Sequence, residues 1–374
     1  MLKKRWLSFV LALAMVLVGV GCSNNNGNGA SDDTTAPAES VKEEIAAETV
    51  AETDAEIASE TKAEETGERK TDYVIATVPK LTAAAWFVRM EEGIKDFAAA
   101  TGVEAYMTGP EEADAAMQAQ YIQDLIAQGV DAICVVPYSM EALEPVLKQA
   151  RDAGIVIIAH EGEGLKNVDY DIEAFDNDEY GEHLLERIAQ KTDGKGDYVV
   201  SVGSLTGGSQ MQWAEAGIAY QKANYPDMNL TADIIESQDM QEQAYQKVKE
   251  VITANPNLAG FQGGAMQDVA GAAMAVDEAG LSGKVVLVGT SLVSVSGKYI
   301  KEGTIDMISF WDPALAGYAM NELALKVLNG EEIADGTDLG LDGYDSLTLD
   351  GNVLKGKAWI DVDAENVDDP AFDF

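Results

Sequence analysis

The sequence predicts an α/β protein of two lobes, each a parallel sheet covered by helices and joined to the other by several chain crossings. From residue 72 onward, short apolar, β-branched runs alternate with amphipathic stretches, which is the pattern of strand–helix units. The apolar runs are nearly continuous, and this indicates strands that are buried on both faces. About 300 residues follow the N-terminal segments, which is enough for two lobes of ordinary size.

The chain begins with the marks of an export signal. Lys3, Lys4 and Arg5 precede an apolar run over residues 6–20, which is shorter than the ~20 residues that span a bilayer. The run ends in small residues and Cys22, an ending that resembles the lipobox of bacterial lipoproteins, where the cysteine is acylated and becomes the mature N-terminus. Gly19 departs from that pattern, in which Leu or a similar residue is usual. The alternative is an ordinary secretory signal with an incidental cysteine.

Residues 23–70 are predicted to form a disordered acidic tether. They consist largely of Asn, Gly, Ala, Glu and Thr, with almost no large apolar side chain. Such a segment cannot bury enough apolar surface to offset the entropy lost on ordering. Repulsion between its glutamates keeps it extended.

Charge and cysteine content exclude several classes of protein. The 374 residues hold 25 Lys and Arg against 65 Asp and Glu, a net charge of −40. This balance argues against nucleic acid and against adhesion to anionic lipid, since both need clustered basic residues. The two cysteines are Cys22 and Cys134, and Cys134 lies in an apolar run that predicts a buried thiol in a strand. With Cys22 acylated, no intramolecular disulfide is expected.

The elements follow in two blocks and a tail. Residues 72–175 are predicted to hold strands at 72–78, 103–107, 132–136 and 155–159, with helices at 87–101, 114–128 and 142–153. Residues 176–311 are predicted to hold strands at 197–202, 229–236, 260–263 and 284–289, with helices at 210–224, 241–255 and 269–279. A helix at 315–328 and short strands at 346–349 and 357–362 complete the chain.

This order predicts which residues form each lobe. We assign residues 72–175 with about 312–345 to an N-terminal lobe, and residues 176–311 with about 346–374 to a C-terminal lobe. Ligands of open α/β sheets bind outside the carboxyl ends of the strands. These ends are expected to converge in a cleft between the lobes.

Several segments carry a resemblance to a known family. They are Val78-Pro79-Lys80-Leu81, residues 127–133, Phe175-Asp176-Asn177-Asp178, residues 209–213, Val288-Gly289-Thr290-Ser291, Phe310-Trp311-Asp312-Pro313 and the ending Phe372-Asp373-Phe374. In this order and spacing, residues 71–374 resemble the sugar-type periplasmic binding proteins of ABC importers, in the ribose-binding branch. Within that branch they look closest to rhamnose-binding proteins and to receptors for the furanosyl autoinducer. The resemblance implies the type I periplasmic-binding-protein fold of two Rossmann-like lobes on a multi-crossover hinge.

A sugar site needs carboxylates and amides for hydroxyl groups, and aromatic rings for the apolar face. Lys80 follows the first strand, and the matching lysine of the autoinducer receptors contacts the ligand; the alternative is a surface lysine. Glu161 follows the strand at 155–159, where the family usually has Asp, and Glu163 competes with it. Trp86 and Phe87 can enclose a sugar face. Because neighbouring side chains on a helix diverge, at most one of these two is expected in the core.

Ser209 and Gln210 begin a predicted helix after a Gly-rich turn at 203–208. Helix N-terminal amides offer donors to a polar ligand. The matching positions of the autoinducer receptors hold Asp and Gln, so Gln210 fits and Ser209 departs, which leaves the ligand open. A nucleotide-binding turn is not indicated, because neither the GxGxxG order nor a GK[ST] ending is present.

Two further segments complete the candidate ligand site. Gly264, Ala265 and Met266 align with a stretch that lines the site in relatives; the alternative is turn packing. Trp311 and Asp312 lie at the last lobe crossing. Trp311 can stack on a sugar face, and Asp312 can bind hydroxyls or fix the hinge. His160, beside a strand end, is expected to be structural.

No catalytic residue, metal site or cofactor is predicted. There is no GxSxG motif, Cys134 lies within a strand, and two histidines are too few for most histidine-based metal sites. Residues 361–365 have partial calcium-loop spacing but lack the Gly and the final Glu, which indicates a solvated acidic segment. A carboxylate pair for glycoside hydrolysis, Glu161 with Asp312, remains open.

The sequence therefore predicts an exported, lipid-anchored solute-binding protein at the outer face of the cytoplasmic membrane, or in the periplasm or cell envelope. Its expected partners are a small sugar or sugar-like ligand, an ABC permease with its ATPase, and the membrane through the lipid anchor only. The alternatives are a sensory receptor subunit for a sugar or furanosyl signal, and a secreted glycoside hydrolase. Replacing Lys80, Glu161 or Gln210 by Ala is expected to weaken binding with little effect on thermal stability.

Overall fold

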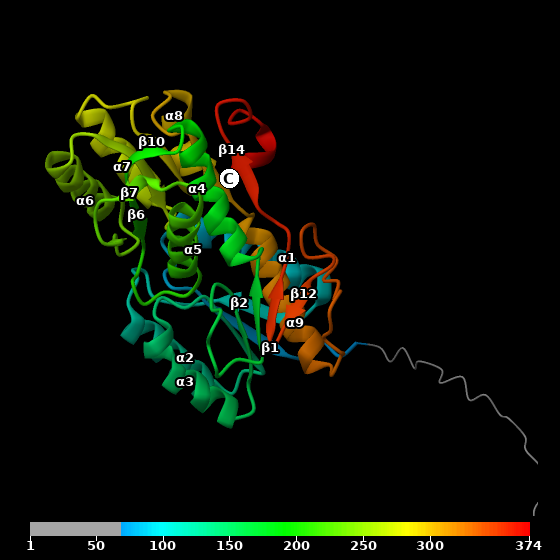
Figure 1. Cartoon of the computed structure of the whole chain (residues 1–374). Helices are drawn as coiled ribbons and strands as arrows, with labels where there is room; N and C mark the ends of the chain where they lie inside the picture. The colour runs from blue at the N-terminus through cyan, green and yellow to red at the C-terminus, as the bar shows by residue number, and fades with distance from the viewer. Residues whose placement is uncertain (1–68) are drawn as a thin grey trace, which may run out of the picture. The chain divides into compact units, whose positions relative to one another are not determined.

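The computed structural model describes residues 69–374, so the leader, Cys22 and nearly all of the predicted tether lie outside the described residues. The described chain forms two α/β lobes, each built on its own largely parallel sheet, which confirms the predicted fold class (Figure 1). In this part of the chain, no helix has the length and apolar character needed to cross a membrane.

The N-terminal lobe has a sheet in the order β12-β13-β5-β4-β3-β1-β2. Its strands are β1 (Val74–Val78), β2 (Glu104–Met107), β3 (Ala132–Val135), β4 (Val156–Ala159), β5 (Tyr170–Glu173), β12 (Thr348–Asp350) and β13 (Val353–Lys355). All neighbours pair in parallel except β12 with β13. Helices α1 (Ala85–Thr101), α2 (Ala115–Gln128), α3 (Met140–Asp152) and α9 (Pro313–Leu328) cover it.

Alternation along the strands divides the core of this lobe between the two faces of the sheet. Ile75 of β1 packs in the cluster of α1 and α9, whereas Ala76 packs in the cluster of α2 and α3. Both sets are buried, which explains the continuous apolar runs. Cys134 of β3 is fully buried, as predicted, and burial raises the pKa of its thiol.

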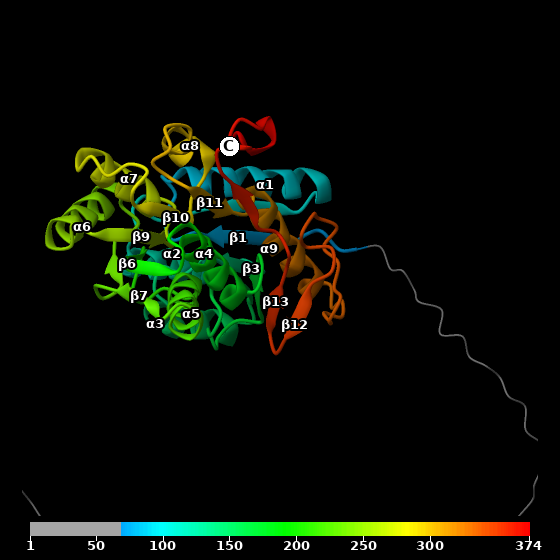
Figure 2. The same ribbon diagram turned by 45° about the horizontal axis from the view of Figure 1, so that its top comes forward.

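The C-terminal lobe has a sheet in the order β14-β11-β10-β9-β6-β7, with β8 also paired to β6. Its strands are β6 (Lys195–Val202), β7 (Asp227–Leu230), β8 (Ile235–Glu236), β9 (Leu258–Gly263), β10 (Val286–Thr290), β11 (Met307–Phe310) and β14 (Ile360–Val362). Its helices are α4 (Asn177–Lys191), α5 (Ser209–Asn224), α6 (Gln241–Ala254), α7 (Asp268–Glu278) and α8 (Val293–Lys301), followed by a 3₁₀ turn, Pro370–Phe372. Figure 2 shows α6 beside α7, and α4 beside α5.

Within residues 69–374 the chain passes between the two sheets three times: after β5, after β11 and after β13. The prediction that residues from 346 onward belong to the C-terminal lobe is wrong for β12 and β13. Val353 pairs with Asp171 in the N-terminal sheet, whereas β14 joins the C-terminal sheet, where it pairs with β11. Strands of three residues carry too little apolar pattern to indicate which sheet they join.

Two helix pairs, α1 with α9 in the N-terminal lobe and α4 with α5 in the C-terminal lobe, approach closely because one helix of each pair has a glycine at the contact. A methyl group on Gly93 of α1 would lie 1.8 Å from the carbonyl oxygen of Ala314 in α9. A methyl group on Gly181 of α4 would lie 2.2 Å from the carbonyl oxygen of Trp213 in α5. No larger residue fits at either helix contact. These glycines therefore set the positions of α9 and α5 beside the cleft.

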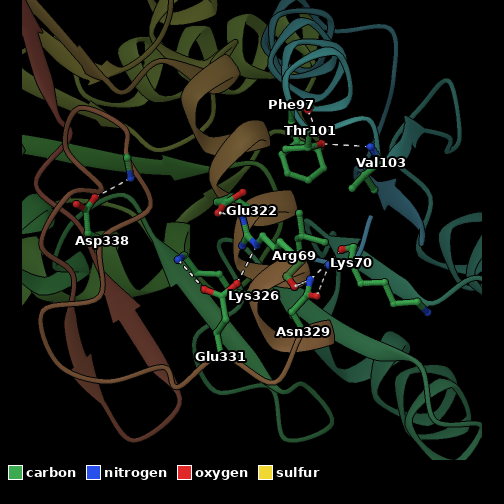
Figure 3. A network of polar contacts seen from close by, with 12 residues as sticks. Arg69, Lys70, Phe97, Thr101, Val103, Glu322, Lys326, Asn329, Glu331 and Asp338 are labelled. Atoms are coloured by element: carbon green, nitrogen blue, oxygen red, sulfur yellow. Dashed lines mark hydrogen bonds and ion pairs between the residues drawn. The ribbon is translucent and has the colours of Figure 1, made fainter. Parts of the chain in front are cut away.

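The first described residues are held at the end of α9. Arg69 pairs through Nη1 with Glu322 and through Nε with Glu331, both at 2.8 Å (Figure 3). The amide of Lys70 donates to Oδ1 of Asn329 at 2.9 Å. The described chain thus begins on the N-terminal lobe. The contacts that hold its first residues include none of the residues that line the cleft described below.

Candidate functional site

A cavity with about 410 Å³ of empty space, part of it open to solvent, lies where the strand ends of the two lobes meet. Its lining comprises Lys80, Leu81, Ala84, Trp86, Phe87, Glu161, Gln210, Trp213, Asp239, Gly264, Met266, Gln267, Thr290 and Trp311. A smaller hollow of about 230 Å³ adjoins it and shares Lys80, Glu161, Gln210 and Asp239. Seven of the nine predicted ligand residues therefore line one cavity, whereas Ser209 lines only the adjoining hollow and Asp312 lines neither.

Lys80 lies between two carboxylates from opposite lobes. Its Nζ is 3.6 Å from Oε2 of Glu161 and 3.7 Å from Oδ1 of Asp239, and the three side chains are 8–10% exposed. Burial lowers the pKa of Lys80, but attraction to Asp239 and Glu161 outweighs burial and leaves that pKa raised. Lys80 is thus a charged group inside the cleft, and the surface alternative is wrong.

Glu161, and not Glu163, enters the cavity. Its backbone has a φ of 58°, a left-handed conformation that is uncommon for glutamate and turns the side chain after β4. Oε2 of Glu163 accepts a hydrogen bond from Nδ2 of Asn177 at 3.3 Å, at the first crossing. The sequence left open which of these two glutamates enters the cavity. The turn of the backbone at Glu161 decides this.

Asp239 is a cavity residue that the sequence analysis missed. It follows β8 in the C-terminal lobe, and it and Gln238 have φ values of 54° and 58°. Burial raises the pKa of Asp239, the Lys80 charge lowers it and Glu161 raises it, with a net upward shift. Its place at the end of a predicted strand was the available signal, the same one that indicated Lys80 and Glu161.

Gln210 and Ser209 lie in the first turn of α5 but have different partners. Oε1 of Gln210 accepts a hydrogen bond from the amide of Gly203 at 2.8 Å, so its Nε2 remains the end available to the cavity. Oγ of Ser209 donates to Oε1 of Glu173 at 2.7 Å, across the two lobes. Ser209 therefore joins the lobes, while Gln210 contributes a donor to the cavity.

Indole rings form one wall of the cavity. Trp86 and Trp311 meet edge to face with ring centroids 4.6 Å apart, and both are buried. Phe87 is also buried, so the prediction that at most one of Trp86 and Phe87 lies in the core is wrong. The first turn of α1 lies at the junction of the lobes. There Trp311 packs on the side of Trp86 that would otherwise face water. Nε1 of Trp86 is buried with no hydrogen-bond partner among the described residues.

Asp312 fixes the second crossing, after β11, which the sequence had indicated as the last one. Its carboxylate accepts hydrogen bonds from Nε and Nη2 of Arg89 at 2.9 and 2.7 Å, and from the amide of Ala314 at the start of α9 at 2.9 Å. These contacts support the hinge role over hydroxyl binding. Glu161 and Asp312 do not share the cavity, so the carboxylate pair considered for hydrolysis is not assembled there.

Behind the wall formed by Gly264 and Met266, Asp268 at the start of α7 accepts hydrogen bonds from Ser201 Oγ at 2.8 Å and from the amide of Ala265 at 3.1 Å. Burial raises the pKa of Asp268 to about 6. Across residues 69–374, no group of three or more His, Cys, Asp or Glu side chains has an arrangement suited to a metal ion. The cavity instead holds hydrogen-bonding groups and aromatic rings, the elements that bind a small polar ligand.

The chain passes three times between two α/β lobes, and a polar and aromatic cavity lies between these lobes. This arrangement defines a two-lobed ligand-binding protein. A family model described as a periplasmic binding protein domain matches residues 75–332, and the chain belongs to this family. The family that the sequence resembled is thereby confirmed.

The chain is also similar to named relatives and to solved structures. The chain is 28% identical to the xylitol-binding protein of Mycolicibacterium smegmatis, over 65% of this chain and 69% of that protein. It is 27% identical to the D-xylose-binding periplasmic protein of Escherichia coli, over 67% and 75%. An ABC transporter solute binding protein from Clostridium phytofermentas with bound L-rhamnose has a TM-score of 0.76 at 22% identity, covering 81% of this chain and 99% of that one. LsrB from Clostridium saccharobutylicum in complex with AI-2 has a TM-score of 0.72 at 19% identity, covering 79% and 98%.

Proposed function

We propose that this protein is an extracytoplasmic solute-binding lipoprotein that captures a small sugar or polyol between its lobes and delivers it to an ABC importer. Hinge motion at the three crossings opens the cavity and closes it over the ligand. The closed form then docks on a membrane permease. Acylation at Cys22 keeps the binding lobes near that permease at high local concentration.

The observation that carries the proposal is the composition of the cavity. Lys80 and Nε2 of Gln210 are donors, Glu161 is an acceptor, and the Trp86 and Trp311 rings supply the apolar wall. Hydroxyl groups need both donors and acceptors, and the ring face of a sugar packs on aromatic side chains. Nε1 of Trp86, buried without a partner among residues 69–374, is a further donor that a ligand can satisfy.

The names of the relatives support a ligand of this kind. Besides the xylitol- and D-xylose-binding proteins, the chain is 26% identical to a D-ribose/D-allose-binding protein of Pseudomonas aeruginosa, over 69% of this chain and 82% of that protein. Hydrolysis is not favoured, because Lys80 lies between the two cavity carboxylates and holds both as its ion-pair partners.

Ligand binding is tested by calorimetry on residues 69–374 with xylitol, D-xylose, D-ribose, D-allose and L-rhamnose. We expect saturable binding of at least one compound, a smaller radius of gyration by X-ray scattering, and recovery of the compound unchanged. If every one of these compounds fails to bind, or if a bound sugar is cleaved, the proposed function is wrong.

Membrane anchoring is tested separately on the full chain expressed in a bacterium. The wild-type chain should incorporate a labelled fatty acid and sediment with membranes, and Cys22→Ala should do neither. Equal sedimentation of both forms would contradict lipid anchoring without affecting the ligand proposal.

A further inference from the structure

The carboxylate of Asp239 has one oxygen with an ion-pair partner and one without. Oδ1 lies 3.7 Å from Nζ of Lys80, whereas Oδ2 is buried with no hydrogen-bond partner among residues 69–374. The side chain is 10% exposed and lines both the cavity and the adjoining hollow. Burying a carboxylate oxygen without a hydrogen-bond donor costs free energy. A donor group on a bound ligand would remove this cost.

The backbone and a neighbouring glycine hold Asp239 in this position. Gln238 and Asp239 are two successive residues in the left-handed region, which only a well-determined turn maintains. A methyl group on Gly203 would lie 2.6 Å from the carboxylate carbon and from both its oxygens. The Gly-rich turn after β6 therefore leaves space for this carboxylate, which is a physical role for Gly203 besides chain reversal.

The charges of the cavity limit which ligands fit. Its titratable lining consists of one cation, Lys80, and two carboxylates, Glu161 and Asp239. Behind this lining, the buried Asp268 has an oxygen without a partner in the described chain, and the Asp239 charge contributes to its raised pKa. The cation is already shared by both lining acids, so a ligand carboxylate or phosphate meets an excess of negative charge.

We propose that Asp239 is a ligand-binding, specificity-determining residue: its free oxygen accepts a hydrogen bond from a ligand hydroxyl, and its charge makes the site select neutral polyhydroxylated ligands over anionic ones. This rests on the proposed function and deepens it. Glu161 contacts the ligand from the N-terminal lobe and Asp239 contacts it from the C-terminal lobe, and Lys80 lies between the two carboxylates. A ligand that satisfies both acids therefore favours the closed arrangement of the lobes.

The test uses calorimetry with matched neutral and anionic probes: D-xylose against D-xylonate, D-ribose against D-ribose 5-phosphate, and L-rhamnose against L-rhamnonate. For the neutral probe that binds most tightly, the anionic counterpart should bind wild type at least 100-fold more weakly. Asp239→Asn preserves size and tolerates the left-handed backbone. It should weaken the neutral probe roughly tenfold or more and reduce the discrimination against the anionic probe.

Gly203→Ala is an independent variant that displaces the carboxylate without removing its charge, and it should also weaken the neutral probe. Asp233→Asn, at an exposed position of the same lobe, is the matched control and should bind as wild type does. Tight binding of an anionic probe, or unchanged affinity in Asp239→Asn with a wild-type melting temperature, would overturn the proposal. Failure of all neutral probes on wild type would instead overturn the proposed function, and this inference with it.

Discussion

Nε1 of Trp311 donates a hydrogen bond to Nε2 of His160 across 3.2 Å, and both side chains are buried. Because Nε2 is the acceptor, the ring proton lies on Nδ1, which donates to the carbonyl oxygen of Ile172 at 2.6 Å. His160 is therefore a neutral imidazole that joins the end of β4 to β5 and to the crossing after β11. It positions a wall of the cavity without lining it.

Replacing His160 by Leu should loosen Trp311, because its buried indole donor loses its acceptor. An unsatisfied buried donor costs ~1–3 kcal/mol, so the variant should melt at a lower temperature. It should also bind the ligand more weakly and show tryptophan emission shifted to longer wavelength. The matched control is His183→Leu: this partly exposed histidine pairs with Asp361 at 2.8 Å, away from the cavity. A His160→Leu variant with wild-type affinity and emission would contradict the positioning role.

Lys80→Met should weaken binding and also hold the lobes apart. From the sequence alone, little effect on stability is expected, but the structure places Lys80 between two buried carboxylates. Removing one partner of a buried ion pair costs ~3–5 kcal/mol when the remaining charge stays buried. Opening the hinge returns the charges to water, so we expect a larger radius of gyration by X-ray scattering.

The double variant Lys80→Met with Asp239→Asn provides the control for this prediction. Removal of one carboxylate relieves the repulsion, so the double variant should be more compact than Lys80→Met alone. Additive effects of the two substitutions would show that the residues do not interact.

Ser209→Asp should destabilise the protein, although Asp is the residue expected here from the autoinducer receptors. Oγ of Ser209 donates to Glu173, a buried carboxyl whose pKa is raised well above its usual value by burial and by Asp171. A second carboxylate at this place lacks a cation, and an uncompensated buried charge costs about 3 kcal/mol or more. Denaturant unfolding should report this loss, and the added substitution Glu173→Gln should recover part of it; an unchanged midpoint for Ser209→Asp would contradict the argument.

Stability should depend on pH through Asp171. Burial raises the pKa of this carboxyl to about 7, from a usual value of 3.8. The folded state therefore binds the proton more tightly than the unfolded state. The stability that this proton contributes is complete below about pH 4 and is lost as pH rises toward 7.

Asp171→Asn carries no proton to lose, so its stability relative to wild type should improve between pH 5 and pH 8, by on the order of 1–4 kcal/mol. Denaturant unfolding at the two pH values measures the difference. Asp345→Asn, at an exposed site of the same lobe, should keep a constant difference from wild type. The same constancy in Asp171→Asn would contradict the assignment.

The sequence predicted those parts of the site that depend on strand ends. Lys80 and Glu161 follow strands with strong apolar patterns, so their meeting in the cleft follows from the parallel sheet alone. Asp239 was missed although it follows the predicted strand at 229–236, which the structure divides between β7 and β8. The partners of Ser209 and Asp312 lie 36 and 223 residues away along the chain. No local spacing in the sequence indicates such contacts.

The order of apolar runs therefore determined the two α/β lobes, most of their elements and the edge at which a ligand binds, because each strand and helix carries its own hydrophobic period. Only the tertiary structure decided that Glu161 and not Glu163 enters the cavity, that Trp86 and Phe87 are both buried, and that β12 and β13 join the N-terminal sheet. These outcomes depend on backbone turns and on contacts between distant segments. A residue's own neighbours in the sequence do not specify such contacts, since they form only when the two lobes pack together.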